Sequence, residues 1–177
     1  MVPISIILNE IHGFFALIYF GSVMVFGIAV VPRIGKLSEG TVGEMARIFF
    51  PPILSFVEAT GMVTVVFGAG EFLHYLLGYY RLGGMKEVYG IIFGTTWGLS
   101  ILVGGILGLI GFFIGFFIAH YLERIFKLFR SLDPSTEVEI EMIQKRLNFL
   151  SIIGAVLLCI TVILMILAVS VLPLPLT

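Results

Sequence analysis

Four long apolar stretches alternate with shorter polar segments along the chain. They cover approximately residues 4–31, 53–80, 90–119 and 147–172. Each is longer than the roughly 20 apolar residues that carry a helix across a bilayer. No stretch has the ten-residue alternation of a transmembrane strand, and irregular backbone is too costly in lipid. The pattern predicts an all-α, polytopic membrane protein, an antiparallel bundle of four transmembrane helices in a single membrane domain of residues 1–177.

Prolines and polar side chains mark the ends of these helices. Prolines fit the first turn of a helix or the chain just after one, and those near the predicted ends are Pro3, Pro32, Pro51, Pro52, Pro173 and Pro175. Two pairs have capping-box spacing and a third has i,i+4 spacing: Thr41 with Glu44, Thr136 with Glu139, and Glu141 with Lys145. We expect a short interfacial helix in the loop 32–52 and an exposed extension before the fourth span.

The few charges predict the orientation of the bundle. Of 177 residues 59% are hydrophobic and 12% charged, and eight of the ten Lys and Arg lie in the loops 32–52 and 120–146. Arg81 and Lys86 are the other two. The positive-inside rule then predicts a multi-pass protein of the cell membrane with cytoplasmic loops and both termini on the outer side. The net charge of −1 gives no indication of a nucleic-acid partner.

The remaining sequence signals are sparse. Cys159 is the single cysteine, so the chain has no CxxC pair and no CxxCH motif for covalent haem attachment. The N-terminal segment has no basic leader region, and we expect it to be retained as the first helix. The aromatic residues Tyr79, Tyr80, Tyr89 and Trp97 are predicted to form a belt near the outer boundary.

Ionisable residues inside the spans are the main functional candidates, because such groups are costly in lipid. They are Glu10, His12, Glu58, Glu71 and His74, with His120 at the inner boundary. At 1.5 Å per residue, His12 lies about 28 Å before Val31, and His74 about 32 Å beyond Ile53. The two histidines are therefore predicted to share a depth near the outer face.

Two histidines at one depth on adjacent helices are suited to axial ligation of a b-type haem. Each neutral imidazole offers one nitrogen to iron while its other nitrogen donates to a nearby acceptor. Arg81, just beyond His74, is a candidate partner for the haem propionates. Ordinary interfacial roles explain the two histidines and Arg81 as well.

The same residues permit a different site. Glu71 and His74 form an ExxH pair on one helix face, and together with His12 and Glu10 they would give a mixed nitrogen and oxygen site for copper, zinc or iron.

Glu58 is a candidate proton-relay group or a protonated hydrogen-bonding partner. The glycine row of the third span either packs closely against a neighbouring helix or leaves room for a macrocycle: Gly94, Gly98, Gly104, Gly108, Gly111 and Gly115.

Three short motifs resemble the small four-helix copper-resistance-D-like membrane proteins, a group similar to the membrane-bound protoporphyrinogen oxidase. They are His12 followed by Phe20-Gly21 and Pro32 in the first span, Arg47-Ile48-Phe49 before Thr60-Gly61 in the second, and the fourth-span ending around Met165. The resemblance implies a four-helix bundle that holds haem, with His12 as the ligand. The third span has no lysine, which departs from the oxidase pattern.

The leading hypothesis is a haem b protein or respiratory-complex subunit that takes part in electron transfer near the outer face. The alternatives are a metal-binding or metal-transport protein and a cofactor-free structural subunit. Expected partners are the lipid bilayer and other membrane subunits or further copies of the chain. No nucleophile–base pair is evident, so the pattern favours an electron-transfer or structural subunit over a stand-alone enzyme.

Overall fold

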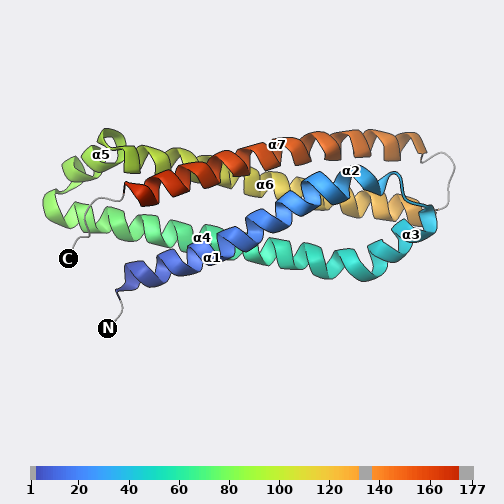
Figure 1. The fold of residues 1–177 in the computed structure, drawn as a ribbon, viewed down its shortest axis with the longest axis horizontal. Helices are drawn as coiled ribbons and strands as arrows, with labels where there is room; N and C mark the ends of the chain where they lie inside the picture. Colours follow the sequence, from blue (N-terminus) through green and yellow to red (C-terminus); the bar gives the residue numbers. More distant parts are fainter. Residues whose placement is uncertain (1–2, 132–136, 172–177) are drawn as a thin grey trace.

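The computed structural model describes residues 3–131 and 137–171, which form helices and no strand. The long helices are α1 (Ile4–Met24), α4 (Phe50–Gly83), α6 (Thr96–Ser131) and α7 (Glu137–Ser170). The short ones are the π-helix η1 (Val25–Val30), α2 (Val31–Ile34), α3 (Glu39–Glu44), the π-helix η2 (Met45–Phe49) and α5 (Met85–Gly94). The four long helices lie side by side along a narrow, elongated bundle (Figure 1).

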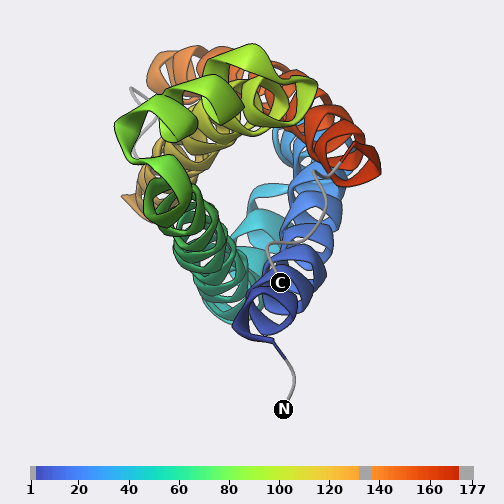
Figure 2. The ribbon, with the colours of Figure 1, turned by 90° about the vertical axis from the view of Figure 1, so that its left-hand side faces the viewer.

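Four helical segments in the described chain are long and apolar enough to cross a membrane: Ile4–Ile34, Gly40–Gly83, Thr96–Leu128 and Val138–Ser170. The predicted fold class, an all-α polytopic helical bundle, is confirmed. The helices pack as two pairs, α1 with α4 and α6 with α7, whereas α4 and α6 have few contacts. Seen along its axis, the bundle is a ring of helices with α5 over one end (Figure 2).

The first span continues through Pro32 instead of ending at Val31. Because proline has no amide hydrogen, it cannot donate to the carbonyls of the preceding turn. The Arg33 guanidinium donates to the carbonyls of Ile28 and Ala29, at 3.1 and 2.8 Å. The Arg33 side chain thus donates to carbonyls to which Pro32 cannot donate. The helix continues from η1 directly into α2.

The short helix expected in the loop 32–52 is α3, but its cap differs from the prediction. Ser38 is the N-cap residue, and its hydroxyl accepts from the Thr41 amide at 3.4 Å. The second predicted capping residue, Thr136, lies outside the described residues. The predicted pair of Glu141 and Lys145 is confirmed, with 2.8 Å between Oε1 and Nζ.

The connection between the second and third spans forms a helix of its own. Gly84 ends α4 with a φ of +69°, a conformation that favours glycine. α5 then runs to Gly94, the chain is extended at Thr95, and α6 begins at Thr96. Residues 90–94, which we assigned to the third span, therefore belong to α5.

The aromatic residues expected as a belt divide into two groups. Trp97 is 1% exposed and packs against Tyr75 and Tyr79, with ring centroids 5.3 and 6.2 Å away. Tyr80 and Tyr89 are exposed. Trp97 and Tyr79 therefore form part of the core between α4, α5 and α6, and they are not anchors at the lipid surface.

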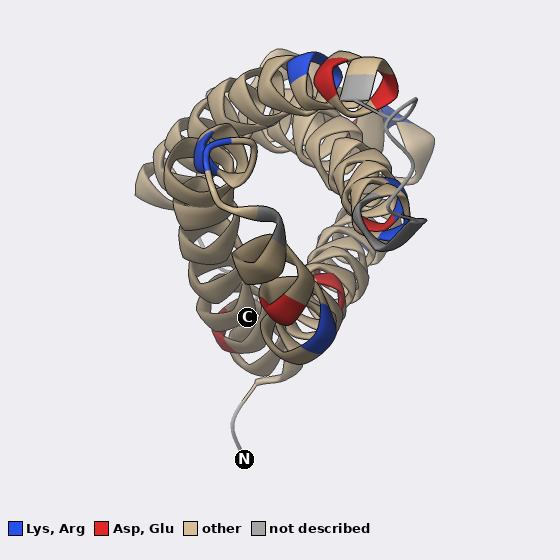
Figure 3. Ribbon diagram, turned by 90° about the vertical axis from the view of Figure 1, so that its right-hand side faces the viewer, with Lys and Arg blue, Asp and Glu red and all other residues tan. Residues whose placement is uncertain are grey.

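The end of the bundle near α3 carries most of the charge (Figure 3). Within it, Val31, Phe50, Leu122, Ile125 and Leu147 form a buried apolar cluster that joins the two helix pairs. Arg124 on α6 forms an ion pair with Glu139 on α7 across its surface. The charged loops are thus held together by an apolar core, as expected for the polar end of a membrane bundle.

The glycine row of α6 packs against α7. A side chain at three of its positions would meet α7: Gly104 faces Leu164, Gly108 faces Thr161 and Gly111 faces Leu158, at 3.1–3.2 Å. Small residues at such spacing allow two helices to approach closely in a membrane. Of the two interpretations of this row, close helix packing is the one that the structure supports.

Candidate functional site

His12 lies where α1 crosses α4. Its Nδ1 is 2.9 Å from the backbone carbonyl oxygen of Thr64, and the side chain is half-buried. A carbonyl oxygen only accepts, so Nδ1 must carry the proton. In the neutral imidazole Nε2 then keeps its lone pair and is free to act as a ligand.

Gly68 makes this position of His12 possible. A Cβ atom at residue 68 would lie 2.6 Å from His12 Cε1 and 2.8 Å from Nδ1, closer than such atoms approach one another. The imidazole therefore rests directly on the α4 backbone. Any side chain at this position would push the ring away from the Thr64 carbonyl.

A second polar contact follows one turn further along the same interface. The Asn9 amide donates to Glu71 Oε1 at 2.9 Å, and both side chains are half-buried. Together with His12 and Gly68, this contact makes the α1–α4 interface polar over two turns.

The structure places His74 further along α4 than His12. His12 contacts Thr64 and Gly68, and His74 is six residues beyond Gly68, about 9 Å along the helix axis. His74 is exposed, with its ring beside Tyr75. His12 and His74 are therefore not at the equal depth that we predicted, and lie almost two turns apart along the helix axis.

This offset has a specific origin. The prediction took Val31 and Ile53 as lying at one level. In the structure Phe26 packs on Phe50, with 6.0 Å between ring centroids, so the two helices are displaced along each other. The π-helical segment η1, which lies between His12 and Val31, also changes the rise for each residue.

The metal-site alternative has no support in the described part of the chain, where no three His, Cys, Asp or Glu side chains converge. Glu71 is engaged by Asn9, and Glu10 and His74 are exposed. Arg81 is exposed in the last turn of α4, and His120 is exposed on α6 beside Tyr121.

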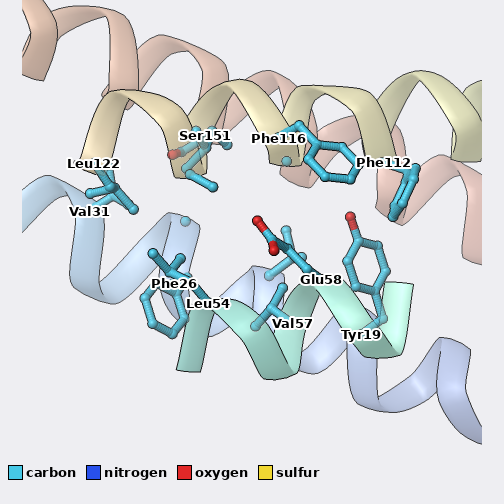
Figure 4. A pocket seen from close by; sticks show the side chains of 15 residues that line it. Tyr19, Phe26, Val31, Leu54, Val57, Glu58, Phe112, Phe116, Leu122 and Ser151 are labelled. Atoms are coloured by element: carbon cyan, nitrogen blue, oxygen red, sulfur yellow. The ribbon is translucent and has the colours of Figure 1, made fainter. Parts of the chain in front are cut away.

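A cavity in the middle of the bundle contains functional candidates that sequence reasoning mostly missed. It is lined by residues of all four long helices and of η1, and the Glu58 carboxylate points into it (Figure 4). Tyr19 and Ser151 contribute hydroxyl groups. Sequence patterns identified Glu58 as an intramembrane carboxylate, but no signal connected it with Tyr19 or Ser151, which lie on other helices.

Comparison with protein-family models, curated proteins and solved structures found no match to the chain.

Proposed function

We propose that the protein is an integral membrane b-type haem protein that takes part in electron transfer, in which His12 would hold the iron. One observation supports this most directly: His12 donates through Nδ1 to the Thr64 carbonyl and leaves Nε2 available. Haem-ligating and metal-ligating histidines ordinarily donate their second nitrogen to such an acceptor, which fixes the tautomer and the ring orientation.

The donor chemistry at this interface fits the cofactor. His12 supplies a neutral nitrogen, and Gly68 lets its ring lie against α4, where a Cβ atom would come within 2.6 Å of it. His74, exposed on α4 six residues beyond Gly68, would be the second ligand, because its side chain, like others in a helix, tilts toward the N-terminus of α4 and so toward the level of His12. Arg81, one turn beyond it, would meet the propionates. When bound, the haem would supply a one-electron iron couple.

The protein's own residues would hold and tune this group. The Thr64 carbonyl orients the His12 ring and increases the basicity of Nε2. The Asn9–Glu71 hydrogen bond joins α1 to α4 next to it and restricts movement of the two helices. The proposal includes the orientation predicted from the charges, with both termini and this site on the outer side of the cell membrane.

The test is an optical spectrum of protein purified from haem-supplemented cells, in the oxidised and dithionite-reduced states. We expect a Soret band that shifts on reduction and is lost in His12→Ala. His74→Ala should change the band position or the potential, because one of the two residues that would hold the iron is removed. His120→Ala is the matched control, because His120 is exposed on another helix. A wild-type protein with no Soret band, or a His12→Ala protein with an unchanged one, would contradict the proposal.

A further inference from the structure

Ser151 is a buried polar group on the wall of the central cavity. It lines the cavity from α7, is 2% exposed, and its hydroxyl forms no hydrogen bond with any residue that the structure describes. Buried polar groups in proteins are nearly always paired, and an unpaired one is especially costly inside a membrane. We therefore expect the occupant of the cavity to be polar where it meets Ser151.

Two further side chains bring oxygen atoms to the same space. The Glu58 carboxylate points into the cavity from α4, and the Tyr19 hydroxyl points into it from α1 (Figure 4). Within the described part of the chain, neither group forms a hydrogen bond or an ion pair. Glu58 is exposed, so the cavity is open beside its carboxylate.

The size of the cavity determines what it can hold. It measures about 60 Å³. One bound water molecule needs about 10–15 Å³ on this measure, whereas pockets for small organic molecules measure about 300–1,000 Å³. The cavity therefore has room for a few water molecules and not for an organic ligand.

The unpaired groups of α7 gather on the side of the helix that meets the cavity. Gln144, Asn148 and Ser151 are four and three residues apart and so lie on one helix face. Gln144 Nε2 donates to the carbonyl oxygen of Val31, which lines the cavity, while Gln144 Oε1 is buried without a partner among the described residues. Polar groups without partners thus recur along this face, as expected for a face in contact with water.

We propose that the central cavity is an internal water site, in which a small cluster of bound water molecules bridges the Ser151 hydroxyl, the Tyr19 hydroxyl and the Glu58 carboxylate. Buried waters in proteins ordinarily make about three hydrogen bonds to groups of this kind. The water pairs Ser151 and solvates an ionisable residue of the second span, whose cost in the membrane is otherwise high. The site does not depend on haem binding.

The experiment is X-ray hydroxyl-radical footprinting of the full-length protein in lipid nanodiscs, read by mass spectrometry. Radiolysis generates radicals from bound as well as bulk water, and these oxidise aromatic rings beside the water. Phe112 lines the cavity and is 7% exposed, whereas Phe50 is 2% exposed and lies in an apolar cluster outside it. We expect Phe112 to be oxidised several-fold faster than Phe50. Equal rates in the wild-type protein would overturn the proposal.

Two substitutions of Glu58 separate hydration from the shape of the cavity. Glu58→Gln keeps a hydrogen-bonding side chain of nearly the same size, and oxidation of Phe112 should persist. Glu58→Leu keeps an approximate volume without a polar group, and oxidation of Phe112 should fall several-fold. Circular dichroism verifies that each variant is folded, and the wild-type comparison holds even if Glu58→Leu does not fold. Unchanged oxidation of Phe112 in a folded Glu58→Leu variant would overturn the proposal.

Thermal unfolding of Ser151→Ala gives an independent readout. If water pairs the hydroxyl, its removal loses a hydrogen bond, whereas removal of an unpaired buried hydroxyl relieves a cost. Ser170→Ala is the matched control on α7, because Ser170 is exposed and donates to the Ile166 carbonyl of its own helix. We expect a lower midpoint for Ser151→Ala than for Ser170→Ala. An equal or higher midpoint would indicate a dry cavity and overturn the proposal.

Discussion

The contact between His12 and Gly68 constrains both residues. The imidazole reaches the Thr64 carbonyl only because residue 68 has no side chain. The orientation of the His12 ring, the proposed ligand, is therefore determined by Gly68 on the neighbouring helix, which has no side chain to bind it. This dependence can be tested without any cofactor.

Gly68→Ala should destabilise the protein by about 1–3 kcal/mol, the usual cost of an extra methyl group in a packed interface. Gly70→Ala is the matched control on the same helix, because its Cβ would lie 3.7 Å from Leu8, an ordinary contact. Thermal unfolding in detergent measures both. If the two alanines lower the midpoint equally, the His12 ring does not rest on Gly68 as described.

Sequence alone could identify some residues of the site but not the contacts that they make. The cost of charge in lipid was sufficient to select His12, Glu58 and Glu71 from 177 residues. Thr64 and Asn9, the partners of His12 and Glu71, were not predictable, because each contact depends on how two helices slide along each other. The displacement of α1 along α4 moved His12 and His74 to different levels.

Between helices, the contact of α6 with α7 depends on a row of glycines. Gly104, Gly108 and Gly111 each face a side chain of α7, whereas Gly105, next to Gly104, has nothing within 4 Å of its Cβ position. One helix thus has a face that contacts α7 and a face with open space around it. The loss of stability caused by a larger residue on α6 should therefore depend strongly on which face of the helix carries it.

Gly108→Val should loosen the α6–α7 pair, because the added carbons meet Thr161 Cγ2, which lies 3.2 Å from the Cβ position. We expect a loss of about 1–3 kcal/mol from overpacking. Gly105→Val adds the same residue to the same helix at the open position and should cost less. The difference between their unfolding midpoints isolates the packing effect from helix propensity. Equal midpoints would contradict the described interface.

Hydropathy predicted the four spans, but the ends of helices depend on local hydrogen bonding that it does not describe. Pro32 was expected to follow a helix end, yet Arg33 donates to the carbonyls of the preceding turn and the helix continues. Residues 90–94 are apolar enough for the third span, yet the extended backbone at Thr95 assigns them to α5. Trp97 appeared suited to a lipid interface, yet it is buried in the core.

For the bundle as a unit, the proposed orientation has a direct test. In a Cys159→Ser background, a single cysteine replaces Lys86 on α5 or Lys36 after α2, both exposed. A membrane-impermeant maleimide should label Lys86→Cys in intact cells and Lys36→Cys only after permeabilisation. The opposite pattern would reverse the orientation and place the proposed haem site on the inner side.

The two helix pairs consist of segments that are consecutive in the chain. The first pair, α1 and α4, is complete by Gly83, and the second, α6 and α7, begins only at Thr96. Domains and subdomains made of neighbouring segments form early during synthesis, because few long-range contacts must wait for later residues. The His12 site therefore belongs to a hairpin that is complete before the second half of the chain exists. The central cavity, by contrast, requires both hairpins, because its lining residues come from α1, α4, α6 and α7.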